Sequence, residues 1–406
     1  MAKTPAALFL PNVKVSPRGA TRLKSGHVWV YRSDIVSADG VLPGSLVGVT
    51  DHRGQFLGSA LYSSSSQIAI RLLSREPVAD FPALLRQRVK DALAYREPIV
   101  HDTNAYRLIF SEADFLPGLI VDRYNDILSL QILTQAMDAE IVRAALISEL
   151  TEKLHPASII ERVDPKIRLL EELPPRFSAL LSGEKTSTTF TMNAIQFHFD
   201  ALEGQKTGAF LDQRENYSAA AQYAHGEALD VFCYQGGFAL HLAPRCAHVT
   251  GVDSSRPALE VADQNAALNT SESNASDFRN NEIEWIEANA FDLLKDYSTS
   301  ASRYDTIVLD PPAFAKSRRD LDAAMRGYKE LNLRAIKMLR PGGILVTCSC
   351  SYHVSQADFL EMLAGAAHDA RRVLRLLEVR GQSKDHPILL NIPETAYLKC
   401  VIAHVN

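Results

Sequence analysis

The sequence has few of the features that mark membrane, secreted or fibrous proteins. It contains no apolar run near about 18 residues, so the pattern of a transmembrane helix is missing. Its first residues carry one early lysine and a short apolar patch cut by Pro11, which is too weak for a secretory signal. Five cysteines, an odd count in 406 residues, do not make a disulfide framework. We therefore expect a cytoplasmic protein with reduced thiols.

The overall charge is also small, but it is unevenly distributed. Lys and Arg number 43 against 48 Asp and Glu, a net charge of −5, which by itself argues against a nucleic-acid partner. Residues 1–75 nevertheless hold nine basic and three acidic residues, so this stretch is +6 and the rest of the chain is −11. A basic unit on an acidic body is the asymmetry expected of an RNA- or DNA-binding module. A basic surface without a partner is the alternative.

The length and the order of patterns predict three domains. With 46% hydrophobic and 22% charged residues the chain has a globular composition. Residues 1–75 consist of short β-rich runs between turns and predict a small β-barrel, with a hairpin at Arg53-Gly54. Residues 76–200 mix strand-like runs with helical spacing and predict an α+β domain. From 201 to 406, apolar strands alternate with helices, which predicts a doubly wound parallel sheet, so the fold class is multidomain α/β.

Particular segments carry these predictions. Helical spacing of apolar residues is found at 82–97, 137–154, 238–246, 258–269, 328–339 and 357–372. Strand-like runs are found at 26–31, 45–51, 68–74, 106–110, 118–124, 127–133, 157–163, 188–199, 227–238, 248–255, 283–291, 304–312 and 342–350.

Acidic residues follow two neighbouring strands of the last domain. Asp230 lies near the end of DVFCYQGGF, before the turn at Gly236-Gly237, and Asp253 ends HVTGVD. Glycine lets the backbone approach a ligand closely, but the G-x-G-x-x-G spacing of a dinucleotide fold is absent. Asp253 is placed to bind two ribose hydroxyls, and a helix N-cap is its structural alternative. The pair of strand-end acids favours a nucleoside ligand.

The fourth and fifth strands of this domain end in chemically unusual sequences. LDPPAF places Asp310 at the strand end and fixes the next two φ angles through Pro311 and its neighbour, so a rigid turn can present polar atoms to a flat ring. GGILVTCSCS ends the next strand with two cysteines on one face. No second pair of metal ligands accompanies them, so we expect no metal. Cys350, beyond the strand end, is the better nucleophile, and Cys348 is the alternative.

These segments together resemble the class I S-adenosylmethionine-dependent methyltransferases. Three further segments indicate a narrower family within this class: 204–217 (GQKTGAFLDQRENY), 106–124 (YRLIFSEADFLPGLIVDRY) and 327–332 (GYKELN). With them the chain resembles bacterial 23S ribosomal RNA cytosine-carbon-5 methyltransferases of the large-subunit methyltransferase I type, over nearly its whole length. The resemblance implies an N-terminal PUA domain that binds RNA, a central α+β domain and a Rossmann-like catalytic domain.

The resemblance also implies site residues. Contacts to S-adenosylmethionine are expected from Phe210, Asp212, Arg214, Asp230, Phe232, Gly236, Asp253, Ser254, Asn289, Asp310 and Pro311. Asn289 stands where the family commonly has an acid that binds the adenine amino group. The nucleophilic cysteine, ninth from the first glycine of GGxLV, is Cys350. Ala313 replaces a second cysteine that helps release the product in related enzymes, so release must use another base.

The implied mechanism is covalent. The Cys350 thiolate adds to carbon 6 of cytosine while Asp310 steadies the ring, and carbon 5 then takes the methyl group. The target base leaves its stack and could rest on Phe314 or Tyr352, and Lys316, Arg318 and Arg319 could hold a phosphate. Alternatives are methylation of a purine nitrogen without a cysteine, an NAD-dependent oxidoreductase and an inactive RNA-binding protein. An exposed β edge in the central domain would permit a homodimer.

Overall fold

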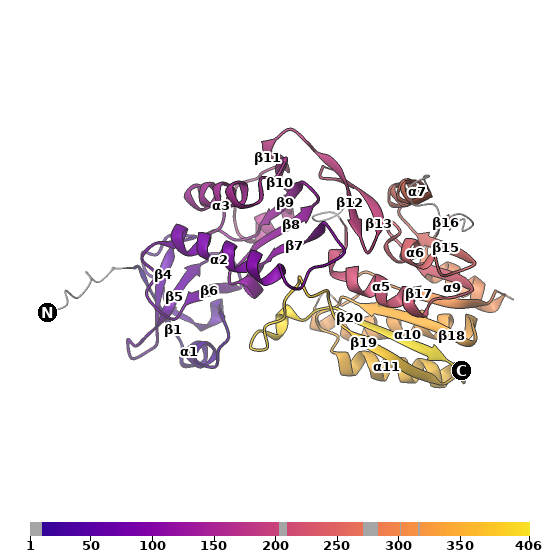
Figure 1. Ribbon diagram of the computed structural model, residues 1–406. Coiled ribbons are helices and arrows are strands. Elements are labelled where there is room, and N and C mark those ends of the chain that lie inside the picture. Colours follow the sequence, from indigo (N-terminus) through magenta and orange to yellow (C-terminus); the bar gives the residue numbers. More distant parts are fainter. Residues whose placement is uncertain (1–9, 203–208, 271–282, 301, 316) are drawn as a thin grey trace. The chain divides into compact units, whose positions relative to one another are not determined.

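The computed structural model describes residues 10–202, 209–270, 283–300, 302–315 and 317–406 (Figure 1). The chain divides into two compact units. The first comprises Met1–Thr188, Phe199–Gly208 and Lys384–Thr395, and the second comprises Thr189–His198, Ala209–Ser383 and Ala396–Asn406. The segments expected as an N-terminal and a central domain thus share one unit. Residues 384–395, expected in the last domain, belong to that unit too.

The first unit begins with a six-stranded sheet in the order β2-β6-β5-β4-β1-β3. Its elements are β1 (Asn12–Val15), α1 (Pro17–Lys24), β2 (Trp29–Tyr31), η1 (Arg32–Asp34), β3 (Ile35–Ser37), β4 (Leu46–Thr50), β5 (Phe56–Tyr62) and β6 (Ile68–Ser74). The predicted hairpin joins β4 and β5. Asp51 accepts the backbone N–H groups of Arg53 and Gln55, and Gly54 adopts φ +81°, which glycine tolerates. Buried valines of β1 and β4 form the core of this sheet.

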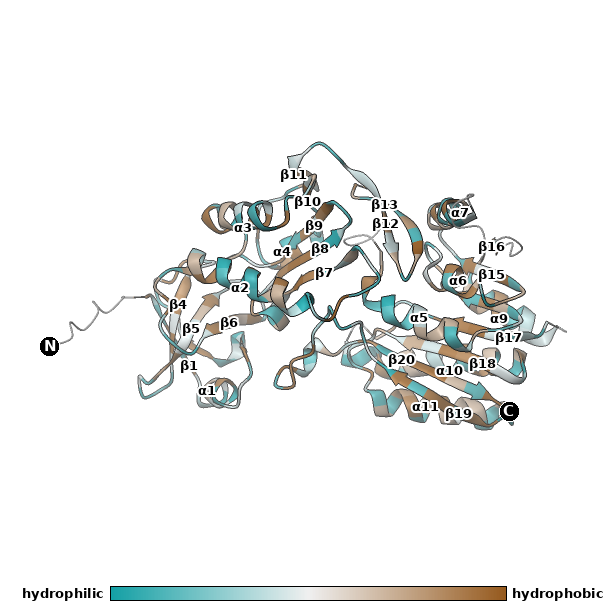
Figure 2. Cartoon of the chain, viewed as in Figure 1, coloured by the Kyte–Doolittle hydropathy of each residue, from teal (hydrophilic) through white to brown (hydrophobic). Residues whose placement is uncertain are grey.

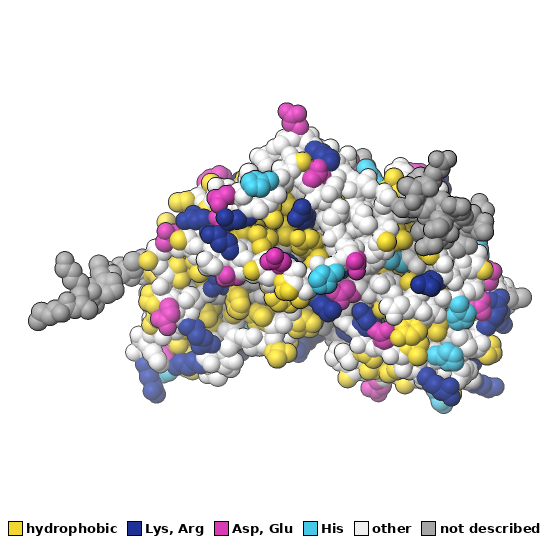
Figure 3. Space-filling model, in the orientation of Figure 1, with side chains coloured by type: hydrophobic (Ala, Val, Ile, Leu, Met, Phe, Trp, Pro, Cys, Tyr) yellow, Lys and Arg dark blue, Asp and Glu magenta, His cyan; other side chains and the backbone are white. Residues whose placement is uncertain are grey.

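Two basic residues of this sheet have acidic partners within it, and a third is buried. Arg18 pairs with Asp34 and Lys24 pairs with Asp51. Arg71 is buried. On the face that Figure 3 shows, dark-blue Lys and Arg side chains lie in separate groups with magenta acids among them. The local excess of positive charge is therefore not one continuous basic surface on that face.

The first unit also contains a five-stranded sheet in the order β11-β10-β9-β8-β7. Its elements are α2 (Phe81–Arg96), β7 (Ala105–Phe110), η2 (Ser111–Asp114), β8 (Leu119–Tyr124), β9 (Ile127–Ile132), α3 (Glu140–Leu154), β10 (Ser158–Glu161), α4 (Pro165–Leu170) and β11 (Ala179–Gly183). The apolar faces of α2 and α3 pack on the sheet, as the helical spacing predicts. Asp80 caps the start of α2 by accepting the N–H of Ala83.

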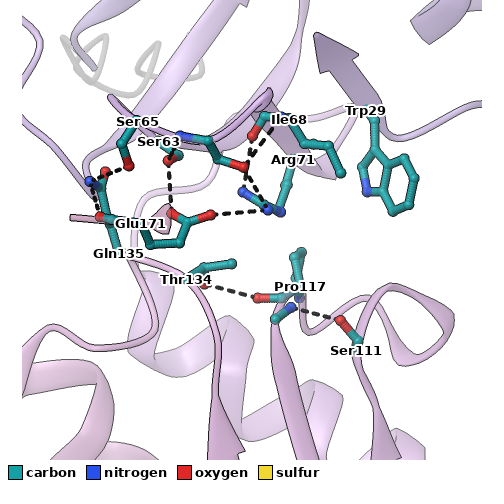
Figure 4. A network of polar contacts seen from close by, with 12 residues as sticks. Trp29, Ser63, Ser65, Ile68, Arg71, Ser111, Pro117, Thr134, Gln135 and Glu171 are labelled. Atoms are coloured by element: carbon teal, nitrogen blue, oxygen red, sulfur yellow. Dashed lines mark hydrogen bonds and ion pairs between the residues drawn. The ribbon is translucent and has the colours of Figure 1, made fainter. Parts of the chain in front are cut away.

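A buried polar network ties β6 to this second layer (Figure 4). Arg71 of β6 donates to Glu171, which follows α4, at 3.3 Å, and Ser63 donates to the same carboxylate at 2.8 Å. Gln135 donates to the Glu171 carbonyl at 2.7 Å. Because Arg71 and Glu171 are both almost excluded from solvent, each is the counter-charge that makes burial of the other tolerable.

The segment 384–395, with η5 (Pro393–Thr395), completes the packing of the first unit. Ile392 joins the hydrophobic core of the N-terminal sheet. The buried Asp385 accepts the N–H of Arg107 at 2.8 Å through its carboxylate, and its carbonyl accepts from Arg96 at 2.8 Å. Sequence patterns do not predict that this segment packs in the first unit, because its contacts join residues nearly 300 positions apart.

The second unit is built on a seven-stranded sheet in the order β16-β15-β14-β17-β18-β20-β19. Its strands are β14 (Glu227–Val231), β15 (His248–Asp253), β16 (Ile283–Glu287), β17 (Tyr304–Leu309), β18 (Leu339–Ser349), β19 (Leu374–Arg380) and β20 (Lys399–Val405). The first five are parallel, and β20 runs antiparallel to both β18 and β19. The doubly wound sheet predicted from the alternating pattern is confirmed.

Helices flank this sheet. They are α5 (Arg214–Tyr223), which follows η3 (Leu211–Gln213), α6 (Gly237–Leu242), α7 (Arg256–Thr270), α9 (Ala290–Thr299), α10 (Leu321–Met338), which follows η4 (Arg318–Asp320), and α11 (Gln356–Asp369). Buried residues of α9, α10 and α11 share one core cluster with β14, β17 and β18. The central strands are largely brown in Figure 2, as expected for a sheet covered on both faces.

The run at 188–199, predicted as extended, is a two-stranded hairpin of β12 (Ser187–Met192) and β13 (Ile195–Asp200). Its turn residues Asn193 and Ala194 both have positive φ, +50° and +68°. Such a turn matches the right-handed twist of the strands. Within the part of the chain that is described, no helix has the length and apolarity needed to cross a membrane.

Candidate active site

Four of the predicted residues stand at one edge of the seven-stranded sheet. Asp230 is the last but one residue of β14 and Asp253 ends β15. Asp310 directly follows β17 and Cys350 directly follows β18. The carboxyl ends of parallel strands share one edge, and ligands bind there where the strand order reverses. The reversal lies at β14, between β15 and β17.

Asp230 is fully buried and only half satisfied. Its Oδ2 accepts the N–H of Ala239 in α6 at 2.8 Å, whereas its Oδ1 has no hydrogen-bond partner among the described residues. Burial, together with the charges of Asp310 and Asp253, raises the pKa of Asp230 to about 8, against the opposing effect of the Ala239 hydrogen bond. A buried carboxyl oxygen without a donor is costly and points to a missing partner.

Asp253 is oriented by the backbone around it. Its Oδ2 accepts the N–H of Tyr234 at 2.9 Å and its Oδ1 accepts the N–H of Ser255 at 2.9 Å. A carboxylate has about four lone-pair positions, so these two bonds fix its direction and leave acceptor capacity for a pair of hydroxyls. Ser254 beside it is exposed.

Cys350 and the Asp310-Pro311 turn lie together. The Cys350 Sγ is 3.9 Å from the Pro311 carbonyl oxygen, and the Asp310 N–H donates to Val231 at 3.3 Å. Of the five cysteines, Cys350 alone is not buried. Cys348, the alternative nucleophile, is 0% exposed and lies opposite Cys400 in the β18–β20 ladder. Burial, together with the nearby Cys400, raises the pKa of the Cys348 thiol well above its ordinary value.

The serines on either side of Cys350 fix the loop that carries it. Ser349 donates to the hydroxyl of Tyr328 on α10 at 3.0 Å, and that hydroxyl is 2.9 Å from the Ser351 hydroxyl. Ser351 also accepts the N–H of Ala315 at 3.1 Å, which anchors the segment after the Asp310-Pro311 turn. One buried network therefore holds the two chemically distinctive loops in register.

The segment expected to cover the cofactor lies beside these loops. Asp212 accepts the hydroxyl of Tyr397 at 2.6 Å, and its backbone carbonyl accepts from Ser383. Phe210 packs edge-on against Tyr234, with ring centroids 5.1 Å apart. Arg214 is buried at the start of α5, where its guanidinium lies 3.5 Å from Glu215. Lys206, Thr207 and Gly208 of the same motif lie outside the described residues.

Tyr217 of α5 is a buried tyrosine whose hydroxyl is affected by the charges of three acids of this site. Burial raises the pKa of its hydroxyl well above 10, and the charges of Asp310, Asp212 and Asp230 add to the rise. Its ring lies directly under Gly237, where a Cβ would come within 2.5 Å of the hydroxyl oxygen. Glycine at this position is therefore needed because a side chain would collide with Tyr217.

Three further predicted residues have local structural roles. Gly236 starts α6 with φ +84°, and Phe232 has φ +69° at the end of β14, a conformation that non-glycine residues rarely adopt. Asn289 caps α9, because its Oδ1 accepts the N–H groups of Phe291 at 2.9 Å and Asp292 at 3.4 Å. The oxygen expected to bind the adenine amino group is thus already engaged, and that contact stays a prediction.

Residues that sequence reasoning missed complete the site. Tyr234, Tyr217 and Tyr397 contact predicted positions, and Lys399 donates to the loop of Cys350. Tyr328 belongs to the GYKELN motif, but the motif alone does not indicate a role for the tyrosine. Its spacing from Cys350 could not reveal the hydrogen bonds, because they depend on how α10 packs against β18.

Comparisons with known proteins agree with this geometry. Residues 13–75 match the PUA-like domain family, and residues 151–399 match the S-adenosylmethionine-dependent methyltransferase family. The ribosomal RNA large subunit methyltransferase I of Shewanella denitrificans is 37% identical over 403 residues, covering 97% of this chain and 99% of the relative. The same-named protein of Photobacterium profundum is 37% identical over 397 residues, covering 95% and 96%.

The chain belongs to the ribosomal RNA large subunit methyltransferase I family. The crystal structure of SMU.776 complexed with SAH superposes with a TM-score of 0.81 at 19% identity, covering 97% of this chain and 99% of the other, so the fold is shared. The family resemblance, the multidomain α/β fold class with its PUA-like N-terminal domain, and S-adenosylmethionine as the cofactor are thereby confirmed.

The residues present fit the cofactor of this methyltransferase I family member. The Asp230 oxygen without a donor is suited to a buried cationic or N–H group, and the Asp253 carboxylate is suited to vicinal hydroxyls. When bound, S-adenosylmethionine supplies an electrophilic methyl group. The described residues contain no cluster of three or more side chains able to hold a metal ion.

Proposed function

We propose that this methyltransferase methylates carbon 5 of a cytosine in large-subunit ribosomal RNA, with Cys350 as the nucleophile and Asp310 as the residue that steadies the base. The observation that supports it most directly is the position of Cys350. The one cysteine that is not buried lies at the carboxyl edge of the sheet, 3.9 Å from the turn that follows Asp310. A nucleophilic cysteine needs access, which buried Cys348 lacks.

The chain's own residues account for addition to the base and for its orientation, and loss of the carbon-5 proton to a base then allows the S–C6 bond to break. Addition of the Cys350 thiolate to carbon 6 places negative charge on the ring, and this makes carbon 5 nucleophilic. Asp310 follows the neighbouring strand β17, and its proposed role is to hydrogen-bond the nitrogen edge of the base and fix its orientation. The Ser349–Tyr328–Ser351 network keeps the loop of Cys350 in one position, which lowers the entropy lost on reaching the transition state.

An RNA substrate is supported by the N-terminal sheet and by the names of the relatives. The PUA-like match covers the segment with the excess of basic residues. Tyr352, 46% exposed beside Cys350, is better placed to stack on an extruded base than Phe314, whose ring packs on Tyr328 with centroids 4.7 Å apart. Arg318 and Arg319 are exposed after the Asp310 turn, and Lys316 lies outside the described residues.

The proposal also includes the domain boundaries and the oligomeric state. The N-terminal domain is proposed as residues 1–75, the central domain as 76–200 and the catalytic domain as 201–406, with the 384–395 excursion noted above. A homodimer stays a prediction. β11 and β7 are the two edge strands of the five-stranded sheet.

The test is transfer of labelled methyl from S-adenosylmethionine to unmodified ribosomal RNA by the wild type, Cys350→Ala and Cys348→Ala. We expect 5-methylcytidine from the wild type and from Cys348→Ala, and none from Cys350→Ala. RNA that contains 5-fluorocytidine should form a denaturation-resistant adduct with the wild type, because a carbon-5 fluorine cannot leave as a proton does. Label in a methylated purine, retained in Cys350→Ala, would instead establish nitrogen methylation.

A further inference from the structure

Lys399 is a buried lysine without an acidic partner. It begins β20 directly opposite Ser349 of β18, and only 7% of it is exposed. Its Nζ donates to the carbonyl of Ser351 at 2.7 Å and to the carbonyl of Tyr397 at 2.8 Å. Both acceptors are neutral, and they use two of the three N–H groups of the ammonium.

Several other buried cations in the described chain are paired with carboxylates. Arg96 pairs with Asp114 at 2.7 Å, Arg143 pairs with Glu161 at 2.5 Å, and Arg168 pairs with Asp138 at 3.1 Å. No carboxylate of the described chain forms an ion pair with Lys399. Burying a charge without a counter-ion is costly, so its retention calls for a group that is negative when the protein functions.

The ionisable side chain whose charge bears on Lys399 is Cys350. Burial lowers the pKa of Lys399 to about 8, and the charge of Cys350 acts in the opposite direction. Two neighbouring elements also carry ionisable groups. Tyr328 of α10, whose pKa is raised chiefly by burial, also senses the charge of Cys350, and Asp310 lies at the end of β17. Of these groups, Lys399 is the cation.

We propose that Lys399 is the positioning residue that keeps Cys350 ionised. Its ammonium is anchored by the two carbonyls and sets positive charge beside the sulfur. The inference rests on the proposed function, in which Cys350 is the nucleophile. On ionisation the S–H bond breaks, its electron pair stays on sulfur and the proton passes to water, while the ammonium keeps its three N–H bonds. When sulfur later leaves carbon 6, the pair of the S–C bond returns to sulfur beside the same ammonium.

The experiment measures the rate at which iodoacetamide alkylates Cys350 in the folded protein between pH 5.5 and 10, read from the mass of the Cys350 peptide. We compare the wild type with Lys399→Met, which keeps length and apolarity, and Lys399→Arg, which keeps the charge. Lys337→Met, at an exposed position of α10, is the control. Loss of a neighbouring cation raises a thiol pKa by about one unit or more, so Lys399→Met should react about tenfold slower at pH 7.

The pH profile separates this role from a structural one. Lys399→Met should converge with the wild type above about pH 9.5, where any thiol is ionised, and Lys399→Arg should stay near the wild type throughout. Equal slowing of Lys399→Met at every pH would overturn the inference. So would a wild-type profile that titrates at or above about 8.5, the value of a free thiol, and this needs no variant to fold.

The two assays together distinguish failure of the proposed function from failure of the Lys399–Cys350 inference. If Cys350→Ala still makes 5-methylcytidine, the proposed function fails, whereas the alkylation profile reports on the Lys399–Cys350 pair without any RNA. If the pair titrates as expected, methyl transfer by Lys399→Met should also recover toward the wild type as the pH is raised from 7 to 9.

Discussion

Replacing Asp230 by asparagine should make the protein more stable, and more so as the pH rises. The reason is the environment of the carboxyl group, which is buried, accepts one backbone hydrogen bond and leaves Oδ1 without a partner. In the folded state its pKa is raised from 3.8 to about 8. Asparagine has nearly the shape of the protonated acid and never ionises, so it removes the cost of ionisation and little else.

The sign and the size follow from proton linkage. A group whose folded pKa is raised contributes its stability below its unfolded pKa, and that contribution is lost as the pH rises through the folded pKa. For Asp230 the window runs from about pH 4 to about pH 8. Each pH unit inside it costs about 1.4 kcal/mol. Between pH 5.5 and 7.5 the stability of Asp230→Asn relative to the wild type should therefore grow by about 2–3 kcal/mol.

The assay is urea unfolding at both pH values, with tryptophan fluorescence as the probe. The chain has two tryptophans, Trp29 and Trp285, and only Trp285 lies in the second unit. A Trp29→Phe background therefore reports on the unit that holds Asp230. A stability difference between Asp230→Asn and the parent that stays constant with pH would refute the reasoning, because every other titrating group is shared.

Two further substitutions test the packing. Glu171→Ala should lower the free energy of unfolding of the first unit by about 3 kcal/mol in urea denaturation, because it leaves the buried Arg71 with only the longer 3.5 Å pair to Glu112. An unchanged midpoint would show that the pair contributes nothing. Gly237→Ala should cost about 1–3 kcal/mol, since its Cβ would lie 2.5 Å from the buried Tyr217, whereas Gly365→Ala in α11, with its nearest atom at 3.6 Å, should be neutral or stabilising. Equal effects of the two glycine substitutions would contradict this account.

The strand-end residues could be predicted because they depend on a local pattern. Apolar runs that end in Asp230, Asp253 and Asp310 are parallel strands, and parallel strands bring their carboxyl ends to one edge whatever the details of packing. The preference for Cys350 over Cys348 is of the same kind, since it follows from where the strand ends. Whether Cys350 is the nucleophile is a question for the methyl-transfer assay.

The features that the sequence did not predict also have physical explanations. Asn193 and Ala194 form a hairpin turn within a run of β-forming residues. The turn is hard to predict because alanine, unlike glycine, rarely adopts a positive φ. The sequence pattern places Asn289 in a strand although it caps a helix, because only Ala288 and Asn289 separate the five-residue strand β16 from the start of α9. β19 and β20 were overlooked, and Lys399 with them, because β20 inserts between strands that are neighbours only in space.

Asp230 and Lys399 are buried ionisable residues for which no ion pair is found among the described residues. Several other buried charges meet opposite charges, as Arg96 and Asp114 do at 2.7 Å. Asp230 has a buried oxygen without a donor, and Lys399 has carbonyls in place of a carboxylate. Both stand at the carboxyl edge of the same sheet. Because each is a stability cost that a neutral residue of similar shape would remove, the two together indicate that this edge is arranged for charges that arrive or develop during the reaction rather than for the resting fold.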